Sequence, residues 1–141
     1  MKKRRAAEMS EAPLALGMGV DLVENKRMQE TLKKWDRAFH DKVFLPREQD
    51  YCDKQAAPWR HYAGRFAVKE AVSKAFGTGI GEHIGWLDVE VLSDPKTGAP
   101  SVRLSPKGRQ LADRRGVDRI LVSLAHTRHY TVAQALLVGG R

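Results

Sequence analysis

The first regular pattern in the chain is an alternation of apolar with small or polar residues between positions 14 and 22, which predicts a β-strand. One face of this strand carries large apolar side chains, namely Leu14, Leu16, Met18, Val20 and Leu22. The other face carries Gly17 and Gly19 and ends at Asp21. Glycines weaken a strand, but they leave room for a ligand or another backbone to approach closely. We interpret Asp21 as a functional carboxylate; a glycine-weakened edge strand ending at an exposed aspartate is the alternative.

A helical pattern follows, from Asn25 as a candidate N-cap to about Ala38. Its apolar stripe consists of Met28, Leu32 and Trp35. Its other side is basic and carries Lys26, Arg27, Lys33, Lys34 and Arg37. Such a run of charge is usually a solvated surface, and a docking surface for an acidic partner is the alternative. A second, short helix is predicted near Pro46, because proline is well tolerated in a first turn.

The strongest helical pattern covers residues 60–76 and ends at Gly77. Apolar side chains cover a broad arc of this helix, and Glu70 and Lys74 fall inside that arc. The polar residues outside the arc are Arg65, Lys69 and Ser73. An acid and a base four residues apart on the side meant for burial are either a self-satisfying buried pair or part of a cleft that binds a metal and a phosphate. We favour the cleft.

The rest of the chain predicts a strand at 86–92, a turn at 94–98, a return strand at 101–104, a helix that begins at Ser105-Pro106 and stops at Gly116, and two apolar strands at 120–125 and 131–138. The fold class is therefore α+β, with an antiparallel or mixed sheet and one long helix available to pack across it. Residues 1–13 are interpreted as a flexible leader and residues 14–141 as a single domain.

Composition narrows the class of protein. The chain has 141 residues, 42% of them hydrophobic and 30% charged, which suits one globular domain with a core. It has no apolar run of about 18 residues that would predict a membrane span, and its basic N-terminus lacks the apolar stretch of a secretory signal. The single Cys52 cannot form an intramolecular disulfide, so we interpret it as a spectator thiol in a reducing cytoplasm.

The net charge of +8 belongs mainly to the predicted domain, because residues 1–13 carry four basic and two acidic side chains. A basic surface attracts nucleic acid, acidic proteins or phosphorylated small molecules. A small nucleic-acid-binding domain is the main non-enzymatic alternative. We do not favour it, because the chain has no nucleic-acid motif and no aromatic stacking platform, and because Glu70 would repel phosphate unless a metal intervened. We expect neither a nucleic-acid nor a membrane partner.

Two isolated carboxylates suit Mg²⁺, which commonly binds one or two carboxylates, several waters and the phosphates of a substrate. Arg65 and Lys74 offer positive charge to a diphosphate, and the glycine-rich loop at 77–81 offers backbone N–H groups. A helix cap followed by a flexible connector is an equally good interpretation of that loop. The absence of a Cys/His cluster argues against zinc, and no nucleophile elbow surrounds a serine.

Several of these segments together resemble the holo-[acyl-carrier-protein] synthase family, a group of small 4'-phosphopantetheinyl transferases. The matching motifs are Gly-Met-Gly-Val-Asp-Leu-Val-Glu at 17–24 with Arg27, Gly-Arg-Phe-Ala-Val-Lys-Glu-Ala at 64–71, Lys-Ala-Phe-Gly-Thr-Gly-Ile-Gly at 74–81, Asp-Val-Glu-Val at 88–91 and Ser-Leu-Ala-His-Thr at 123–127. The resemblance covers roughly residues 16–138 in collinear order. The block that contains Glu70 and the glycine loop is its most specific part.

The resemblance implies a reaction and a site. Members transfer the 4'-phosphopantetheine arm of coenzyme A to a serine of apo-acyl-carrier protein in fatty acid biosynthesis and release adenosine 3',5'-bisphosphate. By this analogy Asp21 and Glu70 bind Mg²⁺, and Glu70 and Lys74 are catalytic, with Glu70 or a metal-bound water as the base. The residues expected to contact coenzyme A are Arg65, Lys74, Gly77, Thr78, Gly79 and His126.

The resemblance also implies an assembly and a partner. Small members are typically homotrimers with active sites at subunit interfaces, and acyl carrier proteins present an acidic helix. The basic helix then becomes a docking surface made by Arg27, Lys33, Lys34 and Arg37, and this docking should be sensitive to salt. A transferase dedicated to polyketide or fatty-acid-synthase carriers is the nearest enzymatic alternative, and a catalytically silent scaffold is a third.

Overall fold

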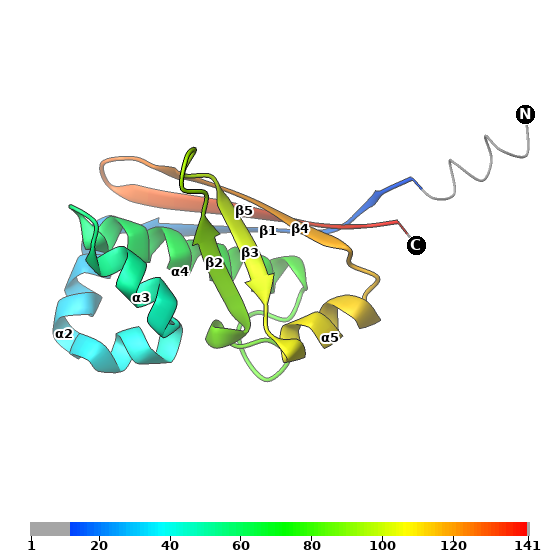
Figure 1. Ribbon diagram of the computed structural model, residues 1–141, viewed down its shortest axis with the longest axis horizontal. Helices are drawn as coiled ribbons and strands as arrows, with labels where there is room; N and C mark the ends of the chain where they lie inside the picture. Colours follow the sequence, from blue (N-terminus) through cyan, green and yellow to red (C-terminus); the bar gives the residue numbers. More distant parts are fainter. Residues whose placement is uncertain (1–11, 141) are drawn as a thin grey trace, which may run out of the picture.

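The protein is described by a computed structural model of residues 12–140, so residues 1–11 of the predicted leader lie outside the described residues (Figure 1). The elements are β1 (Leu14–Glu24), α2 (Asn25–Val43), α3 (Pro46–Asp53), α4 (Pro58–Ala75), the short 3₁₀ helix η1 (Trp86–Asp88), β2 (Val89–Ser93), β3 (Pro100–Leu104), α5 (Pro106–Arg114), β4 (Arg119–His126) and β5 (Tyr130–Gly139). Most predicted elements are present within a few residues of their expected bounds. The predicted strand at 86–92 instead starts with the turn of η1.

The described strands form two antiparallel sheets, one three-stranded in the order β1-β5-β4 and one two-stranded with β2 beside β3. The α+β class is confirmed, and every strand pair in the described part of the chain is antiparallel. Two helices are long, α2 with 19 residues and α4 with 18, whereas one was predicted. Asp21 lies on the edge strand, where it pairs with Ala133 of β5, and Ala133 in turn pairs with Leu124 of β4.

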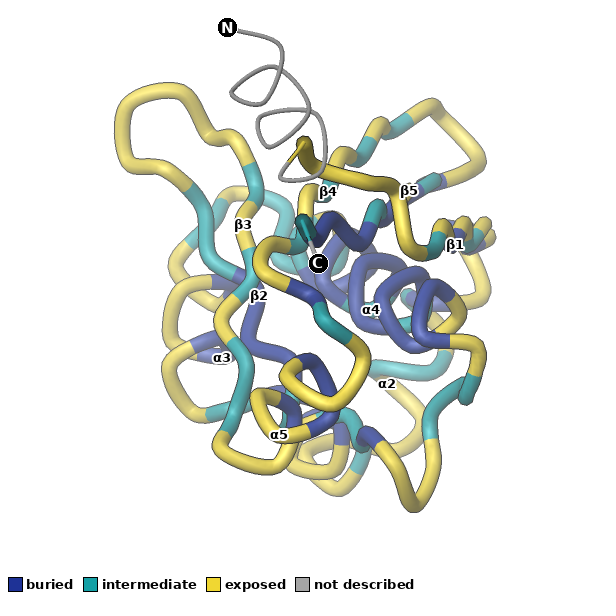
Figure 2. The backbone as a smooth tube through the Cα atoms, turned by 90° about the vertical axis from the view of Figure 1, so that its right-hand side faces the viewer, coloured by how far each residue is buried: buried dark blue, intermediate teal, exposed yellow. Residues whose placement is uncertain are grey.

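Helix α4 is the central element of the fold. It packs against β1, β5 and β4 on one side and against α2, α3 and β2 elsewhere (Figure 2). A Cβ atom at Gly17 would collide with the carbonyl oxygen of Ala75, and one at Gly19 with that of Ala71. The two glycines therefore admit the backbone of α4 and not a ligand. This close approach brings Asp21, two residues further along β1, to the C-terminal half of α4.

The surroundings of α4 correct the predicted arc. Arg65, Lys69 and Ser73, which were predicted to lie outside the buried side, are buried. Glu70 is only half-buried and Lys74 is exposed. An apolar arc predicts that only one side of a helix is buried. In this fold α2, α3 and β2 cover further sides of α4. The premise that set Glu70 apart, its place on the buried side of the helix, is therefore wrong, because Glu70 lies on the more open side.

The apolar face of β1 points away from α4. Leu22, Val20 and Met18 are 62%, 58% and 68% exposed, and Leu121 of β4 and Tyr130 of β5 are exposed on the same sheet. In an antiparallel sheet one face commonly packs on the core while the other meets solvent, and the solvent face is normally polar. The outer face of this sheet is instead apolar, which is a surface that typically marks an interaction site.

Helix α2 differs from its prediction at both ends. Asn25 is not an N-cap, because its side-chain amide donates hydrogen bonds to the carbonyls of Thr127 (3.0 Å) and Arg128 (3.2 Å) in the β4–β5 turn. The helix continues to Val43, but it is interrupted at Asp36, which has φ 50° and ψ −139°. A positive φ in a non-glycine residue is strained. The N-terminal half of α2, with its lysines, is therefore a segment distinct from the half that packs on α3.

Two further predictions concern a membrane span and the thiol of Cys52. Within residues 12–140, no helix is long and apolar enough to cross a lipid bilayer. Cys52 is fully buried, and burial raises the pKa of its thiol to about 12. A buried thiol that stays protonated is a poor nucleophile, in agreement with its interpretation as a spectator.

Candidate functional site

Asp21, Glu70 and Lys74 come together where the end of β1 crosses α4. The Lys74 ammonium donates a hydrogen bond to Oδ1 of Asp21 at 2.9 Å and lies 3.4 Å from the carbonyl oxygen of Val20. The hydrogen bond to Asp21 raises the pKa of Lys74, with help from the charges of Asp21 and Glu70. The Asp21 side chain is 13% exposed and that of Lys74 is 49% exposed. The carboxylate is therefore fixed, whereas the ammonium can reach solvent.

The Glu70 carboxyl group lies on the same side of α4, one turn before Lys74. Burial raises its pKa above the usual value, the charge of Asp21 raises it further, and Lys74 lowers it. Within residues 12–140, no hydrogen bond or ion pair reaches the Glu70 carboxylate. A carboxylate whose charge is disfavoured by burial and by a second carboxylate, beside an open surface, is suited to binding a cation.

This acidic pair can supply only part of a metal's coordination. In the part of the chain that the structure describes, no group of three or more His, Cys, Asp and Glu side chains is arranged to hold a metal. Zinc prefers a full set of nitrogen and sulfur ligands, whereas Mg²⁺ keeps several waters and takes oxygen ligands from a substrate. The donor set formed by Asp21 and Glu70 therefore fits Mg²⁺ bound together with a phosphate.

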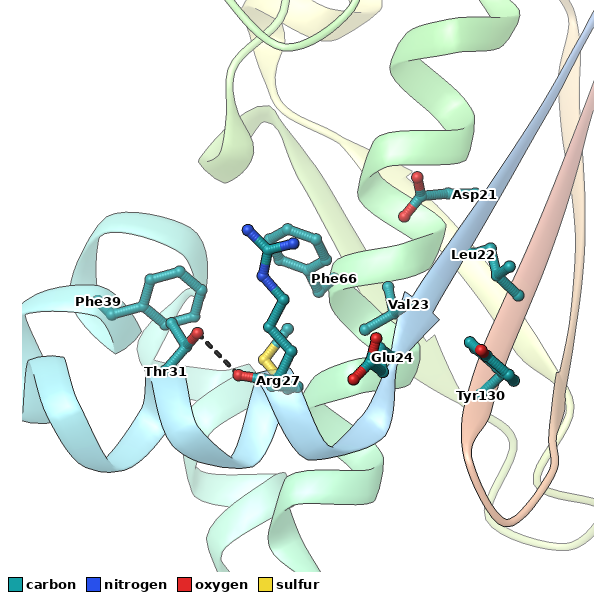
Figure 3. Close-up of a pocket in the computed structure, with 10 residues that line it drawn as sticks. Asp21, Leu22, Val23, Glu24, Arg27, Thr31, Phe39, Phe66 and Tyr130 are labelled. Atoms are coloured by element: carbon teal, nitrogen blue, oxygen red, sulfur yellow. Dashed lines mark hydrogen bonds between the residues drawn. The ribbon is translucent and has the colours of Figure 1, made fainter.

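A pocket of about 550 Å³ adjoins Asp21 (Figure 3). It lies between the end of β1, the first part of α2 and Phe66 of α4, and it is lined by Asp21, Leu22, Val23, Glu24, Arg27, Met28, Thr31, Phe39, Phe66 and Tyr130. Arg27, predicted for carrier docking, lies in its wall and is exposed. The Phe66 ring stacks on Trp86 with centroids 4.9 Å apart, which holds this wall in place.

Arg65 lies on another side of α4. Its guanidinium donates to Oγ of Ser93 at 3.3 Å and stands 4.4 Å from the ring centre of Tyr51. Its Nε is buried and has no hydrogen-bond partner among the described residues. A second cavity, of about 220 Å³, is lined by Arg65 together with Arg47, Arg103, Glu90 and other residues. The three arginines give this cavity positive charge that is suited to an anion, and Glu48 and Glu90 in its lining oppose that charge.

The glycine-rich loop begins where α4 ends. The backbone N–H of Gly77 donates to the carbonyl of Lys74 at 2.9 Å, and those of Thr78 and Gly79 donate to the carbonyl of Ser73 at 3.3 and 3.2 Å. Gly77 and Gly79 have φ of +78° and +64°, which favours glycine at both positions. These three N–H groups thus cap the helix, as in the alternative interpretation of this segment. The Thr78 hydroxyl donates to the carbonyl of Gly79 at 2.8 Å.

His126 lies at the end of β4, two strands away from β1. Its Nδ1 is 2.8 Å from Oγ1 of Thr131, and its ring approaches Gly64 near the start of α4. Burial lowers the pKa of His126, and the positive charges of Arg60 and His61 lower it further. Its ring lies beside Gly64, six residues before Glu70 on α4, and β5 separates β4 from β1. One subunit therefore does not bring His126 to the Asp21–Glu70 pair.

The other three residues predicted to dock the carrier differ in whether their charges are free to meet a partner. Lys33 and Lys34 are exposed, and the Lys34 ammonium lies 5.1 Å from the ring centre of Trp35. Arg37 follows the break at Asp36 and is held by Gln49 and Asp53, each at 3.0 Å. The nearby Tyr62 hydroxyl and the charge of Asp53 raise the pKa of Arg37. Lys33 and Lys34 are thus free to meet a partner, whereas Arg37 also ties α2 to α3.

Sequence reasoning missed the buried ion pair that holds α4 in position. The Lys69 ammonium donates to Oε1 of Glu48 at 2.8 Å and to the carbonyls of Trp86 (2.9 Å) and Val89 (2.6 Å). Glu48 also accepts from the N–H groups of Leu45 and Val91, both at 3.0 Å. The only sequence signal is a lysine directly before Glu70. Its partner is 21 positions away, so spacing alone could not identify the pair.

The chain matches known proteins over most of its length. The sequence profile of the 4'-phosphopantetheinyl transferase superfamily matches residues 17–135. A holo-[acyl-carrier-protein] synthase of Syntrophus aciditrophicus is 44% identical over 123 residues, which cover 87% of this chain and 95% of the relative. One from Protochlamydia amoebophila is also 44% identical over 123 residues, covering 87% of this chain and 98% of the relative.

Solved structures agree with these matches. The holo-[acyl-carrier-protein] synthase of Neisseria meningitidis superposes with a TM-score of 0.82 at 27% identity, covering 88% of this chain and 98% of that one. The Helicobacter pylori holo-[acyl-carrier-protein] synthase, solved in complex with coenzyme A, superposes with a TM-score of 0.75 at 28% identity, covering 85% and 98%. The fold described above is therefore the fold of these enzymes.

Proposed function

The chain belongs to the holo-[acyl-carrier-protein] synthase family of 4'-phosphopantetheinyl transferases, and from this premise we propose that the Asp21–Glu70 site carries out that family's reaction. The enzyme transfers the 4'-phosphopantetheine arm of coenzyme A to a serine of apo-acyl-carrier protein and releases adenosine 3',5'-bisphosphate. The single observation that supports the site is the meeting of Asp21, Glu70 and Lys74 beside the pocket.

Asp21 and Glu70 are proposed to hold Mg²⁺. When bound, the ion neutralises the diphosphate of coenzyme A and polarises the phosphorus to be attacked. Lys74, whose ammonium reaches solvent beside Asp21, is proposed to contact a phosphate oxygen. The transfer breaks the bond between the β-phosphorus and the bridging oxygen, and the leaving group takes the electron pair. Positioning and electrostatic stabilisation therefore account for most of the catalysis.

A base must accept the proton of the attacking serine. Glu70 is the candidate in this chain, because burial and Asp21 raise the pKa of its carboxyl above that of an ordinary glutamate. A carboxylate with a raised pKa is a stronger base near neutral pH. A water held by the metal is the alternative.

Arg65 is proposed to contact a phosphate of coenzyme A with its guanidinium, from the cavity that it lines. Gly77, Thr78 and Gly79 are proposed to border the nucleotide at the C-terminal end of α4, by shape and through the Thr78 side chain, since their N–H groups are engaged in the cap. His126 is proposed to reach the substrate of a neighbouring subunit, because within one chain β5 separates its strand from β1 and its hydrogen-bond partner is Thr131.

The neighbouring subunit is supplied by a proposed homotrimer. The exposed apolar face of the β1-β5-β4 sheet supports it, because closing such a face around a threefold axis removes it from water. We also propose a cytoplasmic location, which a single buried thiol suits.

The trimer can be tested on its proposed interface. Met18→Asp, which adds a charge at a 68% exposed apolar position, is expected to dissociate the protein and to reduce transfer at least about tenfold, because a buried unpaired charge is costly. Sedimentation analysis measures the assembly. Leu87→Asp is the matched control, since Leu87 is exposed (44%) but lies in η1 and not on the sheet. A monomeric wild-type protein with full activity would contradict the proposal.

The carrier is proposed to dock on the basic side of α2 through Arg27, Lys33, Lys34 and Arg37. Arg27 lies in the pocket wall, and Lys33 and Lys34 continue the positive surface toward the break at Asp36. An acidic helix laid along this surface would bring its serine to the pocket mouth. The attraction between the two surfaces raises the association rate and weakens as salt is added.

Reversing two of these charges tests the docking surface. Lys33→Glu with Lys34→Glu is expected to raise the KM for the carrier about tenfold or more and to leave the KM for coenzyme A unchanged. Arg37 is left intact because it also binds Asp53. Lys42→Glu, at an exposed position of α2 beyond the break, serves as the control. An equal rise in both KM values would count against docking at this helix.

The activity itself is tested by incubating the full chain with coenzyme A, Mg²⁺ and an apo-acyl-carrier protein. Mass spectrometry of the carrier is expected to find one added phosphopantetheine arm, dependent on the metal. A carrier of unchanged mass, across fatty-acid and polyketide carriers, would refute the proposed function.

A further inference from the structure

The side-chain amide of Asn25 is buried where β1 passes into α2, and it forms hydrogen bonds on both of its sides. Its Nδ2 donates to the carbonyls of Thr127 and Arg128 in the β4–β5 turn. Its Oδ1 lies 2.7 Å from the hydroxyl oxygen of Thr131. A flipped amide would turn its oxygen toward two carbonyl oxygens, and none of the three can donate a proton. The orientation of the amide is therefore fixed, and the Thr131 hydroxyl is the donor to Oδ1 of Asn25.

Thr131 connects Asn25 to His126. It lies on β5, opposite Val23 of β1 on one side and His126 of β4 on the other. The residue is 0% exposed, so water does not compete for its hydroxyl group. Its Oγ1 is 2.8 Å from Nδ1 of His126. A hydroxyl group has one proton to donate, and that of Thr131 goes to Asn25. In the second hydrogen bond the donor must therefore be Nδ1 of His126, and Thr131 accepts.

The second nitrogen of the His126 ring is left available. Within residues 12–140, no hydrogen bond reaches Nε2. The edge of the ring formed by Cε1 and Nε2 lies beside Gly64 of α4, where even a Cβ atom would stand 3.5 and 3.6 Å from these two atoms. The missing side chain at Gly64 thus leaves this edge uncovered. Burial lowers the pKa of His126, and the positive charges of Arg60 and His61 on α4 lower it further, so the ring is neutral at neutral pH.

Building on the proposed function, in which His126 reaches coenzyme A, we propose that Asn25 and Thr131 are positioning residues that hold His126 in the tautomer protonated on Nδ1. Which ring nitrogen of a histidine carries the proton is set by the hydrogen bond that the other nitrogen or its own proton makes. The network therefore presents an unprotonated Nε2 to the nucleotide. This atom accepts from an O–H or N–H group while the ring is neutral, and it donates to a phosphate oxygen once the ring takes up a proton.

Both residues act through His126 and not on the reacting atoms. Without the network, a neutral ring would carry its proton on Nε2 in part of the molecules, and the two tautomers would present opposite hydrogen-bonding groups to the same substrate atom. Holding one tautomer and one ring orientation removes this competition before coenzyme A binds. We therefore expect the network to affect the affinity for coenzyme A more than the binding of the carrier.

The tautomer can be measured directly by NMR on the full chain labelled with ¹⁵N. At about pH 8, where the ring is neutral, we expect Nδ1 of His126 to be protonated and Nε2 to be unprotonated. The spectrum of a His126→Gln variant identifies these signals among those of the five histidines. Thr131→Val removes the acceptor of the Nδ1 proton, and Asn25→Ala frees the Thr131 hydroxyl to donate to Nδ1. Each variant is expected to shift the ring toward the form protonated on Nε2.

Two further variants are the controls for the tautomer. Thr131→Ser keeps a hydroxyl group at this position and should keep the proton on Nδ1. Thr127→Val removes a hydroxyl group from the same turn, and it should also leave the tautomer unchanged, because that hydroxyl bonds to the backbone of Tyr130 and not to His126. Circular dichroism verifies that each variant is folded.

The second measurement is kinetic. Thr131→Val is expected to raise the KM for coenzyme A about fivefold, which is the effect of one lost hydrogen bond, and to leave the KM for the carrier unchanged. Thr131→Ser should restore the value of the wild type. A wild-type ring protonated on Nε2, a tautomer or a KM for coenzyme A that Thr131→Val does not change, or an equal rise in both KM values would overturn this inference. The tautomer is measured without substrate, so a failure of the wild type to transfer the arm would refute the proposed function and not the assignment of the proton.

Discussion

Glu70→Gln is expected to lower kcat for arm transfer by about 10³-fold while the protein stays folded. The substitution keeps the shape of the side chain and removes its charge, so the proposed Mg²⁺ site loses one of its two carboxylates. A loss of this size corresponds to about 4 kcal/mol of transition-state stabilisation. Initial rates of carrier modification, followed by mass spectrometry over a series of Mg²⁺ concentrations, measure the effect.

Two comparisons separate a metal role from a structural one. Glu30→Gln removes a carboxylate at an exposed position of α2 and should leave the rate unchanged. Asp21→Asn should also lower kcat strongly, and it removes the negative charge from the 2.9 Å contact with Lys74. If Glu70→Gln turned over like the wild type, the assignment of the metal to this pair would be wrong. A thermal transition close to that of the wild type checks that the fold is retained.

The part of this site that lies on one helix could be predicted from the sequence. The apolar periodicity of 60–76 and the glycine at its end predict α4 almost to the residue, and Glu70 stands out because it interrupts the apolar arc. The pairing of Lys74 with Asp21 joins residues 53 positions apart. Periodicity contains no information on such a pair. Only the resemblance to the family suggested that Asp21 and Glu70 act together.

Apolar periodicity also fails to predict that the other sides of α4 are buried. An apolar arc defines a buried side when a helix lies on a surface, but α4 lies inside the fold and is covered on several sides. The sides with few apolar residues are then buried through polar contacts, as for Lys69 with Glu48 and Arg65 with Ser93. These partners come from α3 and β2, so their identity depends on the tertiary fold.

The alternation at 14–22 predicts β1 correctly, but it does not predict which face of the strand packs inside the chain. The face with glycines is the one that packs inside, because it alone lets the backbone of α4 approach. The face with leucine, valine and methionine is exposed in the single chain. A sequence pattern cannot tell whether an apolar face is covered by its own chain or by a second copy. In the proposed trimer both faces of β1 are covered, the glycine face by α4 and the apolar face by a second copy of the chain.

The catalytic geometry also depends on the buried pair beside it, and this leads to the largest expected effect on stability. Lys69→Met is expected to lower the free energy of unfolding by about 3–5 kcal/mol, because it strands the Glu48 carboxylate in a dry interior. The side chains of Lys69 and Glu48 are 0% and 1% exposed, so water cannot take the place of the lost partner. Burial already lowers the pKa of Lys69, and the charge of Glu48 opposes that shift. Urea denaturation measures the change.

A second substitution shows whether the loss of stability in Lys69→Met comes from the unpaired charge of Glu48 or from the lost packing of the lysine side chain. Glu48→Gln in the Lys69→Met background removes the charge and keeps one acceptor oxygen. Leu45 and Val91 donate to different oxygens of Glu48, so one of these two hydrogen bonds is retained. We therefore expect it to restore about half of the lost stability, the rest being lost because the carbonyls of Trp86 and Val89 stay without their donor. Lys107→Met is the control: its 3.9 Å ion pair with Asp88 is largely exposed on the lysine side, so it should cost less than about 1 kcal/mol. If Lys69→Met and Lys107→Met destabilised the protein equally, the buried pair would not be what fixes α4, and the position of Glu70 would have to depend on the packing of α4 against the strands and the other helices.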